Sequence, residues 1–113
     1  MSEQSRSSEP IFSDFADDPD MQELVELFAQ EMPAKIEKVQ SAFEAGRFDD
    51  LRRLAHQLKG AAGGYGFGVV GDAAGRLEEH LATSAAGSAG SIEQIKKDVQ
   101  ALLDLCRNVR ARG

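Results

Sequence analysis

The chain contains 113 residues, of which 42% are hydrophobic, and it carries a formal net charge of −6. This length provides one domain with one hydrophobic core and is too short for a nucleotide-binding kinase domain with anything else. The acidic balance disfavours non-specific nucleic-acid binding, which needs basic side chains against phosphates. The single cysteine, Cys106, excludes an internal disulfide framework and a cysteine-based zinc cluster.

The sequence predicts neither a membrane span nor a secretory signal. No apolar run approaches the ~20 residues that cross a bilayer. Residues 1–9 are polar and lack the apolar region of a secretory signal, so we interpret them as a disordered tail. We therefore expect a cytoplasmic protein without membrane contacts, and the Met1 start favours a free-standing chain over a domain excised from a larger kinase.

The charge is unevenly distributed along the chain. Residues 1–45 carry three basic and eleven acidic side chains, whereas residues 67–113 carry six of each. Residues 46–66 carry four basic and two acidic side chains. This short middle segment is therefore the only one of the three with a net positive charge.

The N-terminal half of the chain predicts one short and one long helix. Residues 11–16 (IFSDFA) contain a small apolar cluster, which predicts a short helix folded over the end of a bundle. From Met21 to Phe43, apolar residues recur at steps of three and four, which predicts an amphipathic helix. We expect Pro33 to kink or interrupt this helix near Met32, because proline lacks an N–H donor and clashes with the preceding turn.

Three further helices complete the predicted fold. Apolar stripes predict helices over Phe48–Tyr65 and Val70–Thr83. The small-residue loop Thr83–Ser91 then leads to a last helix that begins at Ile92. No segment alternates like a strand for more than a few residues. The predicted fold is all-α: an up-down-up-down four-helix bundle with a short extra N-terminal helix, formed by residues 10–113.

His56 is predicted to face solvent on the second long helix. At about 100° per residue, the core stripe of this helix lies roughly 130° away from His56. Lys59 lies one turn further on, where it reaches a group attached to the imidazole. Gly60 and Gly63 share this face, and glycine destabilises a helix interior by roughly 1 kcal/mol relative to alanine. The repetition of glycine on this face indicates the close approach of a partner. The simpler alternative is that His56 is an ordinary surface histidine.

An exposed imidazole suits the acceptance of a phosphoryl group. It is mostly uncharged and nucleophilic near neutral pH. Phosphoryl transfer needs in-line positioning and stabilisation of the charge on the equatorial oxygens. An imidazole with a nearby ammonium supplies the acceptor half of such a reaction, and no motif in the sequence supplies the donor half.

The segment Ala55–Glu78 (AHQLKGAAGGYGFGVVGDAAGRLE) resembles the signature of histidine-containing phosphotransfer (HPt) domains. Its centre is His-x-Leu-Lys-Gly, from His56 to Gly60, and an Ala-x-x-Leu-Glu segment ends at Glu78. The chain has more glycines after this centre than the family usually carries, which leaves the junction between the two helices open. The resemblance implies that His56 accepts the phosphoryl group, that Lys59 contacts it, and that Gly60 leaves room for the partner.

The resemblance also implies a role and a partner for the whole chain. The partner is a response-regulator receiver domain or a hybrid histidine kinase, and the chain is a phosphocarrier without an ATP site or autokinase activity. We expect a monomer with no metal and no cofactor of its own, the magnesium ion being held by the receiver. A helical docking module that is never phosphorylated is the alternative function. The residues expected to contact the partner are Arg52, Gln57, Gly60 and Gly63.

Three other features favour a structural explanation. Residues 66–71 (GFGVVG) match G-x-G-x-x-G, but the preceding segment is predicted to be helical, so helix capping and close helix packing explain these glycines better than dinucleotide binding. His80 is not part of a Glu-x-x-His pair, and we expect a surface or boundary residue rather than a metal ligand. Cys106 lies on the apolar stripe of the last helix and is expected to be a buried small hydrophobe.

Overall fold

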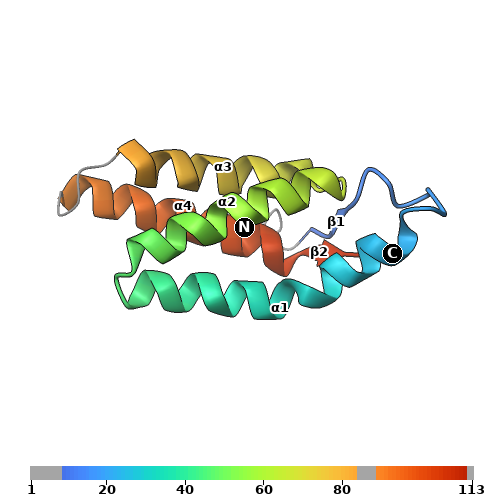
Figure 1. Ribbon diagram of the computed structural model, residues 1–113, viewed down its shortest axis with the longest axis horizontal. Helices are drawn as coiled ribbons and strands as arrows, with labels where there is room; N and C mark the ends of the chain where they lie inside the picture. The colour runs from blue at the N-terminus through green and yellow to red at the C-terminus, as the bar shows by residue number, and fades with distance from the viewer. Residues whose placement is uncertain (1–8, 84–88, 112–113) are drawn as a thin grey trace.

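The computed structural model describes residues 9–83 and 89–111, and the side chains of residues 84–91 are not described. Within these residues the chain forms four α-helices: α1 (Gln22–Glu44), α2 (Phe48–Gly64), α3 (Gly68–Thr83) and α4 (Ala89–Arg107). Consecutive helices run in opposite directions, and each lies beside the next (Figure 1). Contacts between α1 and α4 close the bundle. The predicted four-helix architecture is therefore confirmed.

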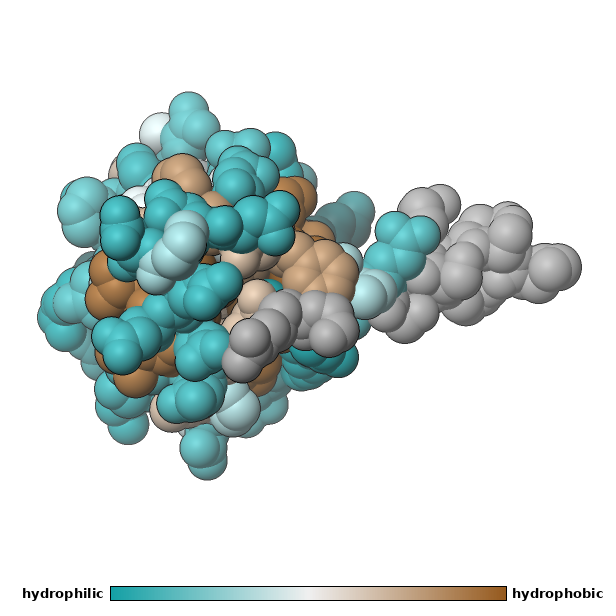
Figure 2. Space-filling model, turned by 90° about the vertical axis from the view of Figure 1, so that its right-hand side faces the viewer, coloured by the Kyte–Doolittle hydropathy of each residue, from teal (hydrophilic) through white to brown (hydrophobic). Residues whose placement is uncertain are grey.

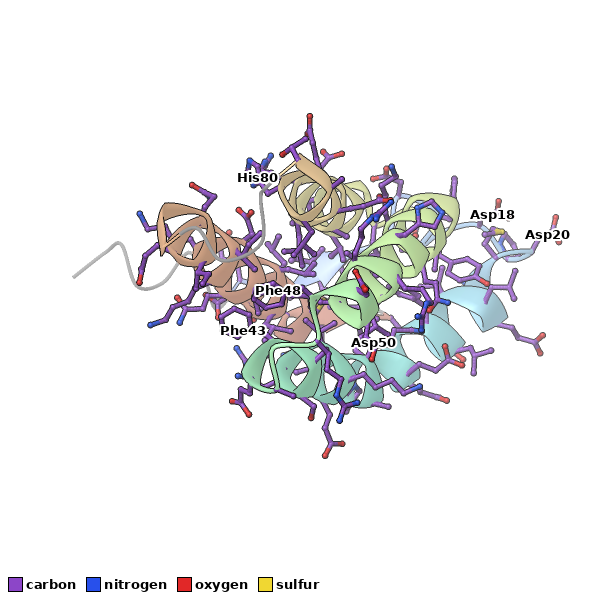
Figure 3. The ribbon with its side chains drawn as sticks, turned by 60° about the vertical axis from the view of Figure 1, so that its left-hand side comes forward. Asp18, Asp20, Phe43, Phe48, Asp50 and His80 are labelled. Carbon is purple, nitrogen blue, oxygen red and sulfur yellow. The ribbon has the colours of Figure 1, made fainter. Side chains whose placement is uncertain are left out.

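The helices form where apolar residues recur at helical spacing, and these residues build one core. Phe28 is buried in this core, with its ring centroid 5.1 Å from that of Phe67 and 5.5 Å from that of Tyr65. Phe43 and Phe48 stack 6.3 Å apart where α1 turns into α2 (Figure 3). Side chains that are less than 2% exposed come from all four helices: Val25, Phe28, Leu51, Val70, Leu77, Ile95 and Leu102.

The predicted short helix over residues 11–16 is wrong. Residues Ile11–Phe12 instead form a short strand, β1, which pairs in parallel with β2 (Val109–Arg110) beside the end of the bundle (Figure 1). The N–H of Ile11 donates to the carbonyl of Asn108 over 2.7 Å, and Ile11 pairs with Val109. The apolar spacing of this segment fits a helical turn, but hydrogen bonds to the other end of the chain satisfy its backbone instead.

The segment that follows β1 is held against the corner between α2 and α3. We call residues 11–18 the N-terminal strap. The buried hydroxyl of Ser13 donates to the carbonyl of Tyr65 over 2.5 Å and accepts the N–H of Phe15 over 2.9 Å. The N–H of Asp14 donates to the carbonyl of Gly66 over 2.9 Å. Gly66 has a φ of +85°, a backbone conformation that favours glycine, so the corner and the strap depend on each other.

The structure refines the prediction at Pro33 and corrects the starts of two helices. Helix α1 continues through Pro33 without interruption, although its ribbon changes direction along its length in Figure 1. Helix α3 begins at Gly68 rather than at Val70, and α4 begins at Ala89 rather than at Ile92. The predicted disordered tail falls almost entirely outside the described residues, as does most of the predicted loop before α4.

The two side chains assigned to structural roles differ in their surroundings. Cys106 is buried, as predicted, and burial raises the pKa of its thiol to about 12. His80 lies on the side of α3 that faces α4 (Figure 3), and its Nδ1 forms a hydrogen bond with a carboxylate oxygen of Asp98. Asp98 is only 7% exposed and also accepts a hydrogen bond from Gln94. His80 is thus a boundary residue with a structural partner on α4.

The Gly66 corner provides a test of the strap. A Cβ atom added at Gly66 would lie 2.4 Å from the hydroxyl oxygen of Ser13, whereas a Cβ atom at Gly68 would meet nothing within 4 Å. We expect Gly66→Ala to lower the free energy of unfolding by about 2 kcal/mol or more, because it adds a clash to a strained backbone conformation. Gly68→Ala should change it by less than ~0.5 kcal/mol. Urea unfolding followed by circular dichroism measures both, and equal effects would contradict the described contact.

Candidate functional site

His56 projects from the middle of α2 into solvent. Its side chain is 67% exposed, which confirms the exposure predicted from its position on the helix. The opposite side of α2 is anchored in the core, and this burial fixes the direction in which His56 points. The residues of α2 that anchor it are Leu51, Ala55, Leu58 and Ala62.

The imidazole of His56 contacts a carboxylate from the neighbouring helix. Its Nδ1 lies 2.8 Å from Oε2 of Glu78, a residue of α3. The other oxygen of this carboxylate, Oε1, lies 3.4 Å from Nζ of Lys59. Glu78 is 21% exposed and therefore bridges the two residues of α2 from a partly buried position. The site is a three-residue cluster built from two helices.

Small residues let α2 and α3 approach closely enough for this cluster to form. A Cβ atom at Gly71 would lie 3.3 Å from the carbonyl oxygen of Lys59 and 3.4 Å from the backbone nitrogen of Gly63. A Cβ atom at Gly75 would lie 3.1 Å from Cδ of Lys59. The glycines thus give room to the backbone of α2 and to the stem of Lys59. Close helix packing explains Gly71, as predicted for this glycine-rich stretch.

The hydrogen bonds of Glu78 define which nitrogen of His56 carries a proton. The hydrogen bond from His56, supported by that from Lys59, lowers the pKa of Glu78 below its ordinary value of 4.5. Glu78 is therefore a carboxylate at neutral pH, and a carboxylate can only accept hydrogen bonds. Nδ1 of His56 must then be the donor, which leaves the lone pair of the neutral ring on Nε2. In such a ring, Nε2 is the nitrogen that can act as a nucleophile.

An open pocket of about 410 Å³ lies beside His56. Two of the arginines near it differ in their interactions. Arg53 lies 3.2 Å from Asp50, which Figure 3 shows on α2, whereas the side chain of Arg52 forms no hydrogen bond or ion pair with any described residue. The pocket is lined by Asp49, Arg52, Arg53, His56 and Glu78.

The residues predicted to contact a partner are all exposed, but they do not all share one face. Arg52, Gly60 and Gly63 lie within roughly 40° of His56 around the helix axis. Gln57 lies roughly 100° away from His56. Cβ atoms at Gly60 and Gly63 would meet nothing within 4 Å, so the surface beside His56 is open there.

Sequence reasoning did not identify Glu78 as a partner of His56. Glu78 enters the sequence motif only as the last residue of its Ala-x-x-Leu-Glu segment. It lies 22 positions after His56, and their contact depends on the register between α2 and α3. The described residues contain no group of three or more His, Cys, Asp or Glu side chains arranged for a metal ion. Among them, no helix is long and apolar enough to cross a membrane.

The sequence model of the Hpt domain matches residues 23–111, which include all four helices almost completely. The chain belongs to the Hpt domain family. No curated protein and no solved structure matches the chain significantly. Hpt domains are phosphocarriers rather than catalytic enzymes, and they interact with receiver domains in phosphorelays. The chain is therefore a module of the two-component phosphotransfer type.

The role of Glu78 in this Hpt domain can be tested by nitrogen NMR of the imidazole. We expect His56 to carry its proton on Nδ1 at pH 8, because the carboxylate of Glu78 accepts it. Glu78→Ala should abolish this preference, whereas Glu79→Ala on the next, exposed residue should preserve it. An unchanged tautomer in Glu78→Ala would show that another group orients the ring.

Acid titration tests the same pair from the side of the carboxylate. Because its pKa is lowered in the folded protein, the stabilisation by this pair is present above about pH 4.5 and is lost as the pH falls through the lowered value. Carbon NMR of the carboxyl group should report a pKa below 4.5 for Glu78, rising towards 4.5 in His56→Ala. An unchanged pKa in that variant would contradict the hydrogen bond.

Proposed function

We propose that the chain carries a phosphoryl group reversibly between His56 and the aspartate of a receiver domain. One observation carries the proposal. Because Glu78 accepts the hydrogen bond from Nδ1, the lone pair of the neutral ring lies on Nε2, and the side chain that carries this nitrogen is 67% exposed. An exposed nucleophile on a rigid helix can enter the active site of another protein. The receiver, rather than this chain, would hold the magnesium ion, and we expect no cofactor or ATP site here.

The proposed step conserves atoms and charge. The lone pair of Nε2 attacks the phosphorus of the phospho-aspartate, and the bond from phosphorus to the aspartate oxygen breaks. The receiver regains a carboxylate, and the imidazole becomes a phosphorylated ring that carries a positive charge. The carboxylate of Glu78, already 2.8 Å from Nδ1, stabilises that charge. The reverse step returns the phosphoryl group by the same path.

Lys59 supplies positive charge beside the reacting group. Its side chain is 51% exposed, and its Nζ lies 3.4 Å from Glu78. From this position the ammonium can offset the charge that develops on the phosphoryl oxygens. Lys59 is thus a proposed stabilising residue, and His56 is the proposed phosphoryl acceptor.

The receiver would cover the exposed part of α2 and the neighbouring half of α1. Gly60 and Gly63 leave the surface open beside His56, and we place Arg52 and Gln57 within the same interface. Leu24 and Leu27 of α1 are 42% and 49% exposed, and they flank Phe28, which packs against the C-terminal end of α2. Apolar side chains also reach the surface at the end of the bundle that faces the viewer in Figure 2. Such a surface suits docking of a folded partner.

A histidine replacement tests the site. The chain is mixed with each phosphorylated receiver domain encoded by the same genome, and acid-labile, base-stable phosphate on the chain is measured. We expect His56→Gln to reduce labelling at least 100-fold, because it removes the nucleophile. His80→Gln is the matched control, since it removes the other histidine, and it should still accept label.

The outcomes of this experiment separate the possible functions. Labelling of His56→Gln at the wild-type rate would show that the site assignment is wrong. A receiver that binds the chain without transferring phosphate would favour the non-phosphorylated docking module. Incubation of the wild-type chain with ATP alone should give no label, and labelling there would contradict the carrier role.

The open surface at Gly60 gives a second prediction. Gly60→Leu should block transfer from the receiver, because the side chain occupies space that the partner needs. Leucine stabilises a helix by up to roughly 1 kcal/mol relative to glycine, so circular dichroism should show the fold intact. Ala101→Leu, on the exposed side of α4, is the control and should transfer normally. Normal transfer by Gly60→Leu would contradict the close approach of the partner.

A further inference from the structure

The pocket beside His56 is lined by arginine side chains and not by Lys59. Arg52 lines this pocket together with His56, whereas Lys59 lines a separate groove with Gly63 and Gly75. The ammonium of Lys59 is also engaged already by Glu78 at 3.4 Å. A phosphoryl group on the side of His56 that faces the pocket would therefore meet a guanidinium.

Arg52 is positioned to reach a group attached to His56. It precedes His56 by four residues on the same helix, which corresponds to about 6 Å along the helix axis. Helical side chains lean towards the N-terminus, so the imidazole leans over the turn that carries Arg52. Arg52 is exposed and has no partner among the residues that the structure describes. Its five donors are available to a ligand.

The other charged side chains that line this pocket do not take the place of Arg52 beside a phosphoryl group. Arg53 is paired with Asp50 at 3.2 Å, and the carboxylate of Glu78 is engaged by His56 and Lys59. Asp49 is unpaired among the described residues, but it precedes His56 by seven residues, or about 10 Å along the axis. Arg52 therefore lies between this carboxylate and the imidazole.

We propose that Arg52 binds the phosphoryl oxygens on Nε2 of His56 directly, in addition to the positive charge that Lys59 supplies from its position beside Glu78. This inference rests on the proposed function and assigns the group that receives the phosphoryl charge. A planar guanidinium can donate two parallel hydrogen bonds to one phosphoryl group, which an ammonium cannot do. Arg52 then contacts the transferred group itself and not only the surface of the receiver.

A small phosphoryl donor separates these two roles of Arg52. Phosphoramidate phosphorylates without any protein interface: Nε2 attacks its phosphorus, the phosphorus–nitrogen bond breaks, and ammonia leaves. We expect Arg52→Gln to slow labelling of His56 by phosphoramidate roughly tenfold, because it removes charge-assisted hydrogen bonds. Arg52→Lys should restore part of the rate. Arg47→Gln, which makes the same charge change outside the pocket, should label at the wild-type rate.

Phosphorus NMR provides a readout that a purely structural role would not change. The phosphohistidine signal should shift in Arg52→Gln and remain in place in Arg47→Gln. Equal labelling rates in wild type and Arg52→Gln would overturn the inference, as would a loss that affects only transfer from a receiver. A rate loss found in Arg53→Gln instead would also overturn it. If the wild-type chain accepts no label from either donor, the proposed function itself fails, which is a distinct result.

Discussion

The close packing of α2 against α3 is the constraint on which the site depends. His56 and Lys59 lie on one helix, but the carboxylate that joins them comes from Glu78 on the other. At Gly71, even one methyl group would approach the backbone of α2 to 3.3 Å. Larger side chains there would separate the helices and withdraw the carboxylate from the imidazole. Gly71 contributes no side chain to the core, but it lets Glu78 reach the imidazole and hold the proton on Nδ1 of His56.

The strap supports the same pair of helices from their common end. Ser13 and Asp14 bond to the carbonyls of Tyr65 and Gly66, which form the corner between α2 and α3. The strap is itself anchored by the pairing of β1 with β2. A contact between the two ends of the chain thus stabilises the turn that sets the register of the site. At the opposite end of α3, the pair formed by His80 and the buried Asp98 ties the helix to α4.

The sequence predicts the helices well because their signal is local. Apolar residues recur within each helix, and the exposure of His56 follows from helical geometry alone. The errors concern contacts between distant positions. Ile11 pairs with Val109 across almost the whole chain, and no local pattern distinguishes that strand from a helical turn. The contact of Glu78 with His56 likewise depends on a helix register that periodicity does not specify.

The arrangement of charges suits a group that must be both accepted and returned. If the full charges of Lys59 and Arg52 both acted on the phosphoryl group, the phosphohistidine would be strongly stabilised relative to the phospho-aspartate, and return to a receiver would slow. Glu78 instead offsets one of these cations and the charge on the imidazole. Arg52 then keeps its full charge for the phosphoryl oxygens, and Lys59 adds a charge that Glu78 partly offsets. In the overall acidic chain, the basic stretch over residues 46–66 thus supplies a site whose positive charge is limited by a carboxylate from α3.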